Sequence, residues 1–297
     1  MRIANKTIYD TIKNNLFRTS DEMTRANQVI SSGKRINRPS DDPVGQVSVL
    51  GLRSSLANIE QLGRNITMGR SWLDMAESAM NQTEEVLSEA KALAVQMSNS
   101  TQGQTQRESA AQQVEGYIEQ ILNAANTQVD GRYIFSGTKT DTTPFAYDRE
   151  QGQVDYQGNG TSFKVRIGKD MEVEVGRDGR DVFGDPDGDS MFKTLIDFAH
   201  SLRSNDAAGI QDAIGELQGQ LDSVNSSIAE NGARSIRLNL RESIIEDLDL
   251  SYTERKSTLE DADLAEAVVD LKTKELAYQA ALASSSRVMQ MSLVNYL

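Results

Sequence analysis

The 297-residue sequence contains no cysteine and only one histidine, His200. Without cysteine the chain can form no disulfide, thiol nucleophile, iron–sulfur cluster or cysteine-ligated zinc site, and a lone histidine cannot supply the histidine pair of a zinc protease. Aromatic residues make up 5% of the chain, and only 4 residues are proline. This composition argues against a compact barrel or sandwich and favours long helices that pack through small side chains.

The sequence also lacks a long apolar run. A membrane-spanning helix needs about 20 consecutive apolar residues, and charged or polar residues interrupt the densest apolar stretches, 91–97 and 265–271. The N-terminus has neither the apolar core nor the small-residue cleavage site of a secretory signal. We therefore expect no membrane insertion, and a protein that stays in the cytoplasm or leaves the cell without a cleaved signal.

Acidic residues outnumber basic ones by 44 to 31, which gives a formal net charge of −13. Nucleic acid is therefore not an expected partner, because binding to phosphates requires a basic face. The charge is unevenly distributed. Residues 1–40 hold eight bases and three acids, a net +5, whereas residues 241–297 hold six bases and eleven acids, a net −5. The two ends should therefore attract each other.

Near the start of the chain, apolar residues recur at alternating spacings of four and three, with Thr19 in one of these positions. So narrow a stripe predicts a coiled-coil helix, not the wider face of a globular core helix. The helix should end at Gly33, a natural C-terminal cap, and a new helix should begin at Asp42 and Pro43. The stripe consists of Ile12, Leu16, Met23, Ala26 and Ile30.

A similar stripe at heptad spacing lies near the end of the chain, interrupted by Glu275 and Ser285. We expect both stripes to act as assembly interfaces. The two ends bury little apolar area, whereas ordering a backbone costs about 1–2 kcal/mol per residue. Both ends should therefore be disordered in the isolated chain and become helical when neighbouring subunits cover them. The second stripe consists of Leu264, Val268, Leu271, Tyr278, Leu282 and Met289.

Between the two ends, the sequence predicts two long helices followed by a β region. The helical pattern runs from residue 44 to about residue 129, with a turn at residues 98–104, and should form an intramolecular core. From Gly131 the residues alternate between apolar and polar, and glycines punctuate them. The expected strands are residues 132–135, 154–156, 163–167 and 171–175.

Helical patterning returns at Met191, with breaks expected near Asn205 and at Asn231 and Gly232. The predicted fold is mainly α with a β insertion. It comprises a terminal α-helical coiled coil, a long antiparallel helical bundle domain and a small central antiparallel β domain. The expected boundaries are 1–40 with 255–297 for the coiled coil, 41–137 with 191–254 for the helical rod, and 138–190 for an outward-facing β domain.

No pattern in the sequence supports catalysis or ligand binding. Residues 185–189 imitate the opening of a calcium loop but lack its later glycine and glutamate, and residues 158–160 lack the third glycine of a dinucleotide loop. His200 has no second histidine with which to share a metal. The acidic pairs at 41–42 and 260–263 should serve helix starts. We predict no catalytic, cofactor-binding or metal-binding residue, and no enzyme activity.

The two ends together resemble a known family. Residues 30–45 resemble the N-terminal signature of the bacterial flagellin superfamily, and residues 259–268, 279–283 and 292–297 resemble its C-terminal signature. Within that superfamily, Arg-Pro-Ser-Asp-Asp-Pro at 38–43 and the motif at 131–141 are more similar to the hook-associated junction proteins than to flagellins.

The resemblance implies a structural protein of the bacterial flagellum that forms the junction layer between hook and filament and templates flagellin assembly. It implies no cofactor. Its expected partners are further copies of itself in a ring-like or helical layer, the other hook-associated junction protein, flagellin and a flagellar export chaperone. The chain would leave the cell unfolded, through the flagellar type III apparatus, and act outside it.

Two alternatives stay open. The first is flagellin itself, which is distinguished by its copy number and by forming filaments alone. The second is a cytoplasmic coiled-coil binding module, which would keep stable terminal helices in the monomer and would not be found outside the cell.

Overall fold

The structure is a computed structural model that describes residues 2–99, 102–148, 152–186 and 188–294, without the side chains of 2–5, 8 and 289–294. The chain divides into two compact units, one of Met1–Ile59 with Asp247–Leu297 and one of Glu60–Glu246. Two long helices, α2 (Pro43–Met97) and α6 (Ala207–Glu260), contribute to both units. Within the described residues, no helix combines the length and apolarity needed to cross a membrane.

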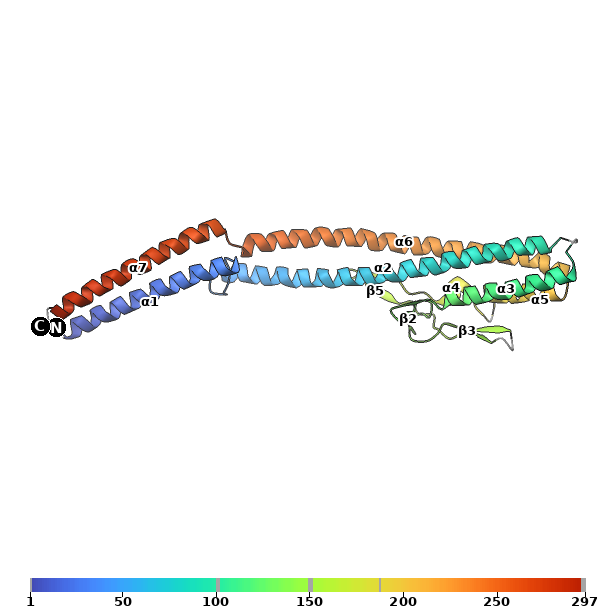
Figure 1. Ribbon diagram of the computed structural model, residues 1–297, viewed down its shortest axis with the longest axis horizontal. Helices are drawn as coiled ribbons and strands as arrows, with labels where there is room; N and C mark the ends of the chain where they lie inside the picture. The colour runs from blue at the N-terminus through green and yellow to red at the C-terminus, as the bar shows by residue number, and fades with distance from the viewer. Residues whose placement is uncertain (1, 100–101, 149–151, 187, 295–297) are drawn as a thin grey trace. The chain divides into compact units, whose positions relative to one another are not determined.

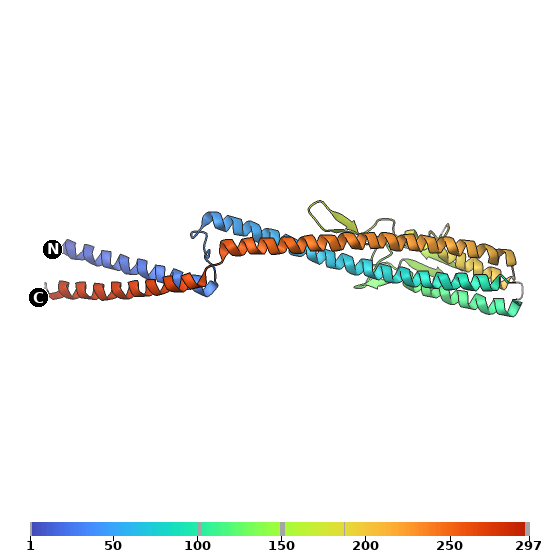
Figure 2. The same ribbon diagram turned by 90° about the horizontal axis from the view of Figure 1, so that it is seen from above.

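In the first unit, the two terminal helices lie side by side. These are α1 (Arg2–Ser32) and α7 (Leu264–Val294), drawn in blue and red in Figures 1 and 2. The predicted pairing of the ends is thus confirmed within one chain. Gly33 ends α1 with φ +69°, and its N–H donates to the Val29 carbonyl at 2.9 Å. The predicted cap at Gly33 and the predicted helix start at Pro43 are also confirmed.

The second unit holds most of the buried apolar side chains. Here α3 (Gln104–Ala125) packs against α5 (Met191–Arg203), and the short helix α4 (Gly179–Phe183) precedes α5. Four of the few phenylalanines gather in one fully buried cluster, with ring centroids 5.0 to 6.2 Å apart. The scarce aromatic residues are therefore concentrated where the β region meets the helices. The cluster consists of Phe135, Phe145, Phe183 and Phe192.

Within the described residues, the β region consists of three antiparallel two-stranded hairpins, which confirms the predicted antiparallel β insertion. The first turn, Asp130 and Gly131, has φ of +52° and +77°, as a two-residue Asp-Gly hairpin turn requires. The strands at 128–129 and 145–148 were not predicted, and the helix expected to reach about residue 129 ends at Ala125. The hairpins are β1 (Gln128–Val129) with β2 (Arg132–Tyr133), β3 (Phe145–Asp148) with β4 (Gln153–Tyr156), and β5 (Lys164–Arg166) with β6 (Glu172–Glu174).

One predicted break in the C-terminal helices is correct and another is wrong. Residues 204–206 separate α5 from α6, as expected near Asn205. The break at Asn231 and Gly232 does not exist, because α6 runs through both residues. Asn231 is buried, and its side-chain amide donates to the Leu73 carbonyl at 2.8 Å. Its side chain therefore makes a tertiary hydrogen bond and does not compete with its own helix backbone.

The distribution of the core predicts uneven protection of backbone amides. Among the described residues, the first unit buries only four apolar side chains: Ala26, Ile36, Val49 and Ile59. In a dilute monomer we expect rapid hydrogen exchange over residues 12–30 and 265–288 and slow exchange over 62–97, which serves as the internal control. Hydrogen exchange with mass spectrometry tests this expectation. Equal protection of all three segments would show that the terminal helices are stable before assembly.

Candidate functional site

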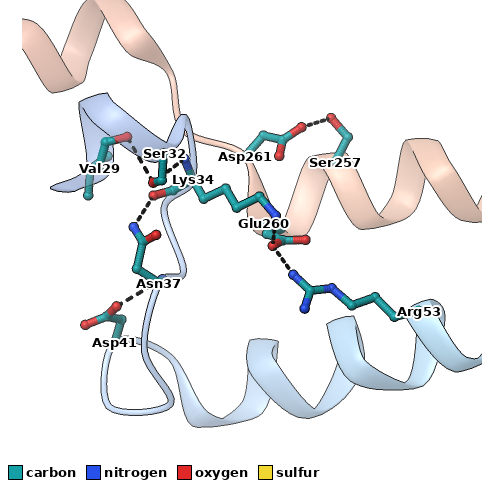
Figure 3. Close-up of polar contacts among 9 residues, drawn as sticks. All are labelled: Val29, Ser32, Lys34, Asn37, Asp41, Arg53, Ser257, Glu260 and Asp261. Atoms are coloured by element: carbon teal, nitrogen blue, oxygen red, sulfur yellow. Dashed lines mark hydrogen bonds and ion pairs between the residues drawn. The ribbon is translucent and has the colours of Figure 1, made fainter.

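The two sequence signatures, far apart along the chain, lie against each other in the first unit. Figure 3 shows the loop 33–42, between α1 and α2, beside the link 261–263, between α6 and α7. The N–H of Arg35 donates to the Glu260 carbonyl at 2.7 Å, and the N–H of Ala262 donates to the Gly33 carbonyl at 3.0 Å. We call this pair of segments the elbow. Backbone hydrogen bonds therefore join the N-terminal signature to the C-terminal one.

A buried ion pair lies at the centre of the elbow. The Glu260 side chain is only 3% exposed, and its carboxylate accepts hydrogen bonds from Lys34 Nζ at 2.6 Å and from the Arg53 guanidinium at 2.5 Å (Figure 3). Burial acts to raise the pKa of Glu260, but the hydrogen bonds and charges of Lys34 and Arg53 outweigh it, and the pKa lies below its ordinary value. One carboxylate at the end of α6 therefore binds cations from the loop and from α2.

Other acidic residues shape the elbow. Asp42 accepts from the N–H of Gly45 at 2.8 Å, and Asp263 accepts from the N–H of Ala265 at 2.8 Å, so both serve helix starts as predicted. Asp41 instead accepts from the N–H of Arg38 at 2.8 Å, within the loop. The prediction that both acidic pairs serve helix starts is therefore wrong for Asp41, and it is also wrong for Glu260, which ends a helix.

All five residues of the predicted α1 stripe lie on the covered face of the helix. Ala26 is buried, and Ile12, Leu16, Met23 and Ile30 are half-buried. Helix α7 packs against α1. Lys274 on α7 also forms an ion pair with Glu22 on α1 at 3.1 Å. The stripe therefore lies on the less exposed side of α1.

The covered face of α7 only partly coincides with the predicted stripe. Leu271 and Tyr278 are half-buried, but Leu264, Val268 and Leu282 are 53%, 47% and 44% exposed. The side chain of Met289 lies outside the described residues. Between Ala267 and Val288, the covered positions other than Glu275 again alternate in spacings of four and three: Ala267, Leu271, Lys274, Tyr278, Ala281, Ser285 and Val288.

The opposite faces of α7 remain apolar as well. Val269 and Leu276 are 67% and 66% exposed, in addition to the three exposed stripe residues. A helix that is apolar around most of its circumference is usually buried on all sides. Helix α1 covers only one side of α7. The remaining apolar surface therefore favours contact with another protein surface.

Neither catalytic nor metal-binding candidates come together in the described part of the chain. His200 is exposed on α5. No group of three or more metal-binding side chains is found among the described residues. In the acidic segment 185–189, Asp187 lies outside those residues. The absence of enzyme activity stays a prediction.

Comparison with known proteins places these helices in one family. Residues 3–140 match the family model of the bacterial flagellin N-terminal helical region, and residues 211–297 match that of the bacterial flagellin C-terminal helical region. Flagellar hook-associated protein 3 of Escherichia coli K12 is 26% identical over 316 aligned residues, which cover 99% of this chain and 98% of the relative. A flagellin of Salmonella typhimurium is 32% identical over 127 residues, which cover 43% of this chain and 25% of the relative.

Among solved structures, the chain resembles a putative flagellar hook-associated protein from Vibrio parahaemolyticus. The TM-score is 0.69 at 20% sequence identity, and the alignment covers 74% of this chain and all of the other. This likeness shows a shared fold.

Replacing Glu260 by glutamine tests the buried ion pair. Glu260→Gln keeps the size of the side chain and removes its charge, so the two cations lose a charged acceptor. We expect the amides of Arg35, Ile36 and Ala262 to exchange about tenfold faster. A hydrogen bond to a charged group contributes about 1.5–3 kcal/mol to stability. Because Lys34 and Arg53 are half-exposed, we expect a contribution at the lower end of this range. Glu254→Gln, on the exposed side of α6, is the matched control. Unchanged exchange in Glu260→Gln would contradict the account.

The lowered pKa of Glu260 also predicts a pH dependence. A carboxyl group whose folded pKa is depressed stabilises the fold above its unfolded pKa of about 4.3, and this contribution is lost as the pH falls through the folded pKa. The same three amides should therefore lose protection below about pH 4 in the wild-type chain but not in Glu260→Gln. Hydrogen exchange between about pH 3 and 6, corrected for intrinsic rates, measures the difference. Identical pH profiles for the two chains would contradict the assignment.

Proposed function

This chain belongs to the bacterial flagellin family, and from that premise we propose that it is a structural subunit of the flagellum in the layer between hook and filament. One observation carries the proposal. The hook-associated relative aligns with this chain from end to end, whereas the Salmonella flagellin aligns with less than half of it. A subunit at this position needs surfaces for its own copies and for the structures on either side.

The exposed apolar surface of α7 supports a role in assembly. We propose that Leu264, Val268 and Leu282 contact neighbouring subunits directly. The sequence pattern alone adds Met289 to this proposal. The covered stripe residues would act one step earlier, by holding α1 and α7 together as the unit that assembles. They are Ile12, Leu16, Met23, Ala26, Ile30, Leu271 and Tyr278.

We also propose the finer partners that the resemblance implies. The chain would contact the other hook-associated junction protein on one side of the layer and flagellin on the other. A cysteine-free chain whose first unit buries few apolar side chains is easily exported unfolded through the flagellar type III apparatus. The uncovered apolar face of α7 would give an export chaperone a surface to hold before assembly.

The expected domain division belongs to the same proposal. The coiled coil at 1–40 with 255–297 would form the assembling part, and the helical rod at 41–137 with 191–254 would support it. The β domain at 138–190 would face outward.

A second candidate function is that of the filament subunit. The 32% identity to the Salmonella flagellin over 127 residues is higher than the 26% identity to the hook-associated relative. Flagellin would also use the exposed apolar faces of its terminal helices. The two functions differ in copy number and in position along the flagellum.

A strain lacking this gene tests the proposal. We expect hooks without filaments, with unpolymerised flagellin in the medium, and restoration by the wild-type chain. Leu282→Asp and Leu271→Asp should both fail to restore filaments while leaving the second unit folded, since each places a charge in apolar surface needed for assembly. Met171→Asp, which alters an exposed apolar residue of the second unit, is the control.

Missing filaments without shed flagellin in that strain would mean that the chain is the filament subunit. Normal filaments carried by the Leu282→Asp chain would contradict the assembly role of the exposed face of α7.

A further inference from the structure

A hollow of about 340 Å³ beside the elbow is rich in arginine. Arg25 of α1 and Arg35 and Arg38 of the loop line it, with Asp41 and Val29. Three guanidinium groups and one carboxylate are therefore among the groups that line the hollow. Guanidinium groups suit carboxylate guests, because their planar donors can bind both oxygens at once.

The arginines of the hollow are only partly satisfied within the chain. Arg25 pairs with Asp21 one helical turn away at 3.0 Å, and both side chains are exposed. The Arg35 guanidinium lies 3.5 Å from the Asp42 carboxylate and donates a hydrogen bond to the Leu259 carbonyl at 2.8 Å. Arg38 donates to the side-chain oxygen of Gln28 at 3.0 Å and has no carboxylate partner among the described residues. The hollow therefore keeps donors available for an external acid.

Carboxylates without partners occur on the first turns of α7. Glu266 and Asp270 are one turn apart on the same face, both are exposed, and neither has an ion-pair partner among the described residues. Val269 lies beside them and is 67% exposed. We call Glu266, Val269 and Asp270 the acidic edge. Its apolar residue, Val269, matches Val29, the apolar residue that lines the hollow.

We infer that the arginine hollow of one copy of this chain receives Glu266 and Asp270 of the next copy. The inference rests on the proposed function, because it requires copies that assemble side by side. The two carboxylates would give Arg38 the acidic partner that it lacks within its own chain, and they would offer Arg35 a second one besides Asp42. The hollow and the acidic edge are different surfaces of the same chain, so the contact is head to tail and can propagate into a ring or a helix.

Reciprocal charge reversal tests the contact in the strain that lacks the gene. Arg38→Glu alone and Asp270→Arg alone should each lower the share of hooks that carry filaments by about tenfold, because each variant sets like charges against each other. The variant chains should be exported and shed into the medium. Glu254→Arg, an exposed charge reversal on α6 outside the contact, should assemble as the wild type does. Unchanged amide exchange in the second unit checks that each variant is folded.

Co-expression of the two variants separates a contact between copies from a contact within one chain. When copies alternate, Glu at position 38 of one meets Arg at position 270 of the next, and the wild-type pair re-forms at the following contact. The mixture should therefore restore filaments. A mixture that stays defective, or single variants that assemble normally, would overturn the inference. Filaments in the strain that lacks the gene altogether would instead overturn the proposed function.

Discussion

The ion pair of Glu260 with Lys34 and Arg53 is the interaction on which the arrangement of the first unit depends. The carboxylate ends α6, one cation follows α1, and the other lies on α2. A single buried side chain thus connects three segments. Backbone hydrogen bonds between the loop and the end of α6, and between the link and the loop, lie beside it. Because α1 ends and α7 begins at this point, the elbow joins the end of α1 to the start of α7.

The first unit buries few apolar side chains among the described residues, which suits a protein that assembles. The second unit encloses a phenylalanine cluster and most of the buried apolar side chains, whereas the first buries few among the residues described. Helix α7 shows the imbalance most clearly, because α1 covers one side and large apolar residues remain exposed on the others. Contact with further subunits would bury this surface and stabilise the terminal helices, so folding of the ends would be coupled to assembly.

Local patterns in the sequence predicted local structure well. The α1 stripe, the cap at Gly33 and the start at Pro43 each depend on neighbouring residues, and each was found. Apolar residues occur on several faces of α7, so two heptad registers fit its sequence. For this reason, only part of the predicted α7 stripe lies on the covered face. Long-range contacts left no local pattern: the Asn231 hydrogen bond to α2 keeps a helix intact, and the partners of Glu260 lie more than 200 residues away. The sequence gives one indication of the Glu260 contact: the N-terminal signature contains a basic loop, and the C-terminal signature contains an acidic run.

The position of the chain on the flagellum tests most directly whether it forms a layer between hook and filament. Antibodies raised against the purified chain and detected with gold particles would be applied to intact isolated flagella under the electron microscope. The account predicts a single labelled band where the hook meets the filament. Label along the whole filament would contradict it and identify the chain as the filament subunit.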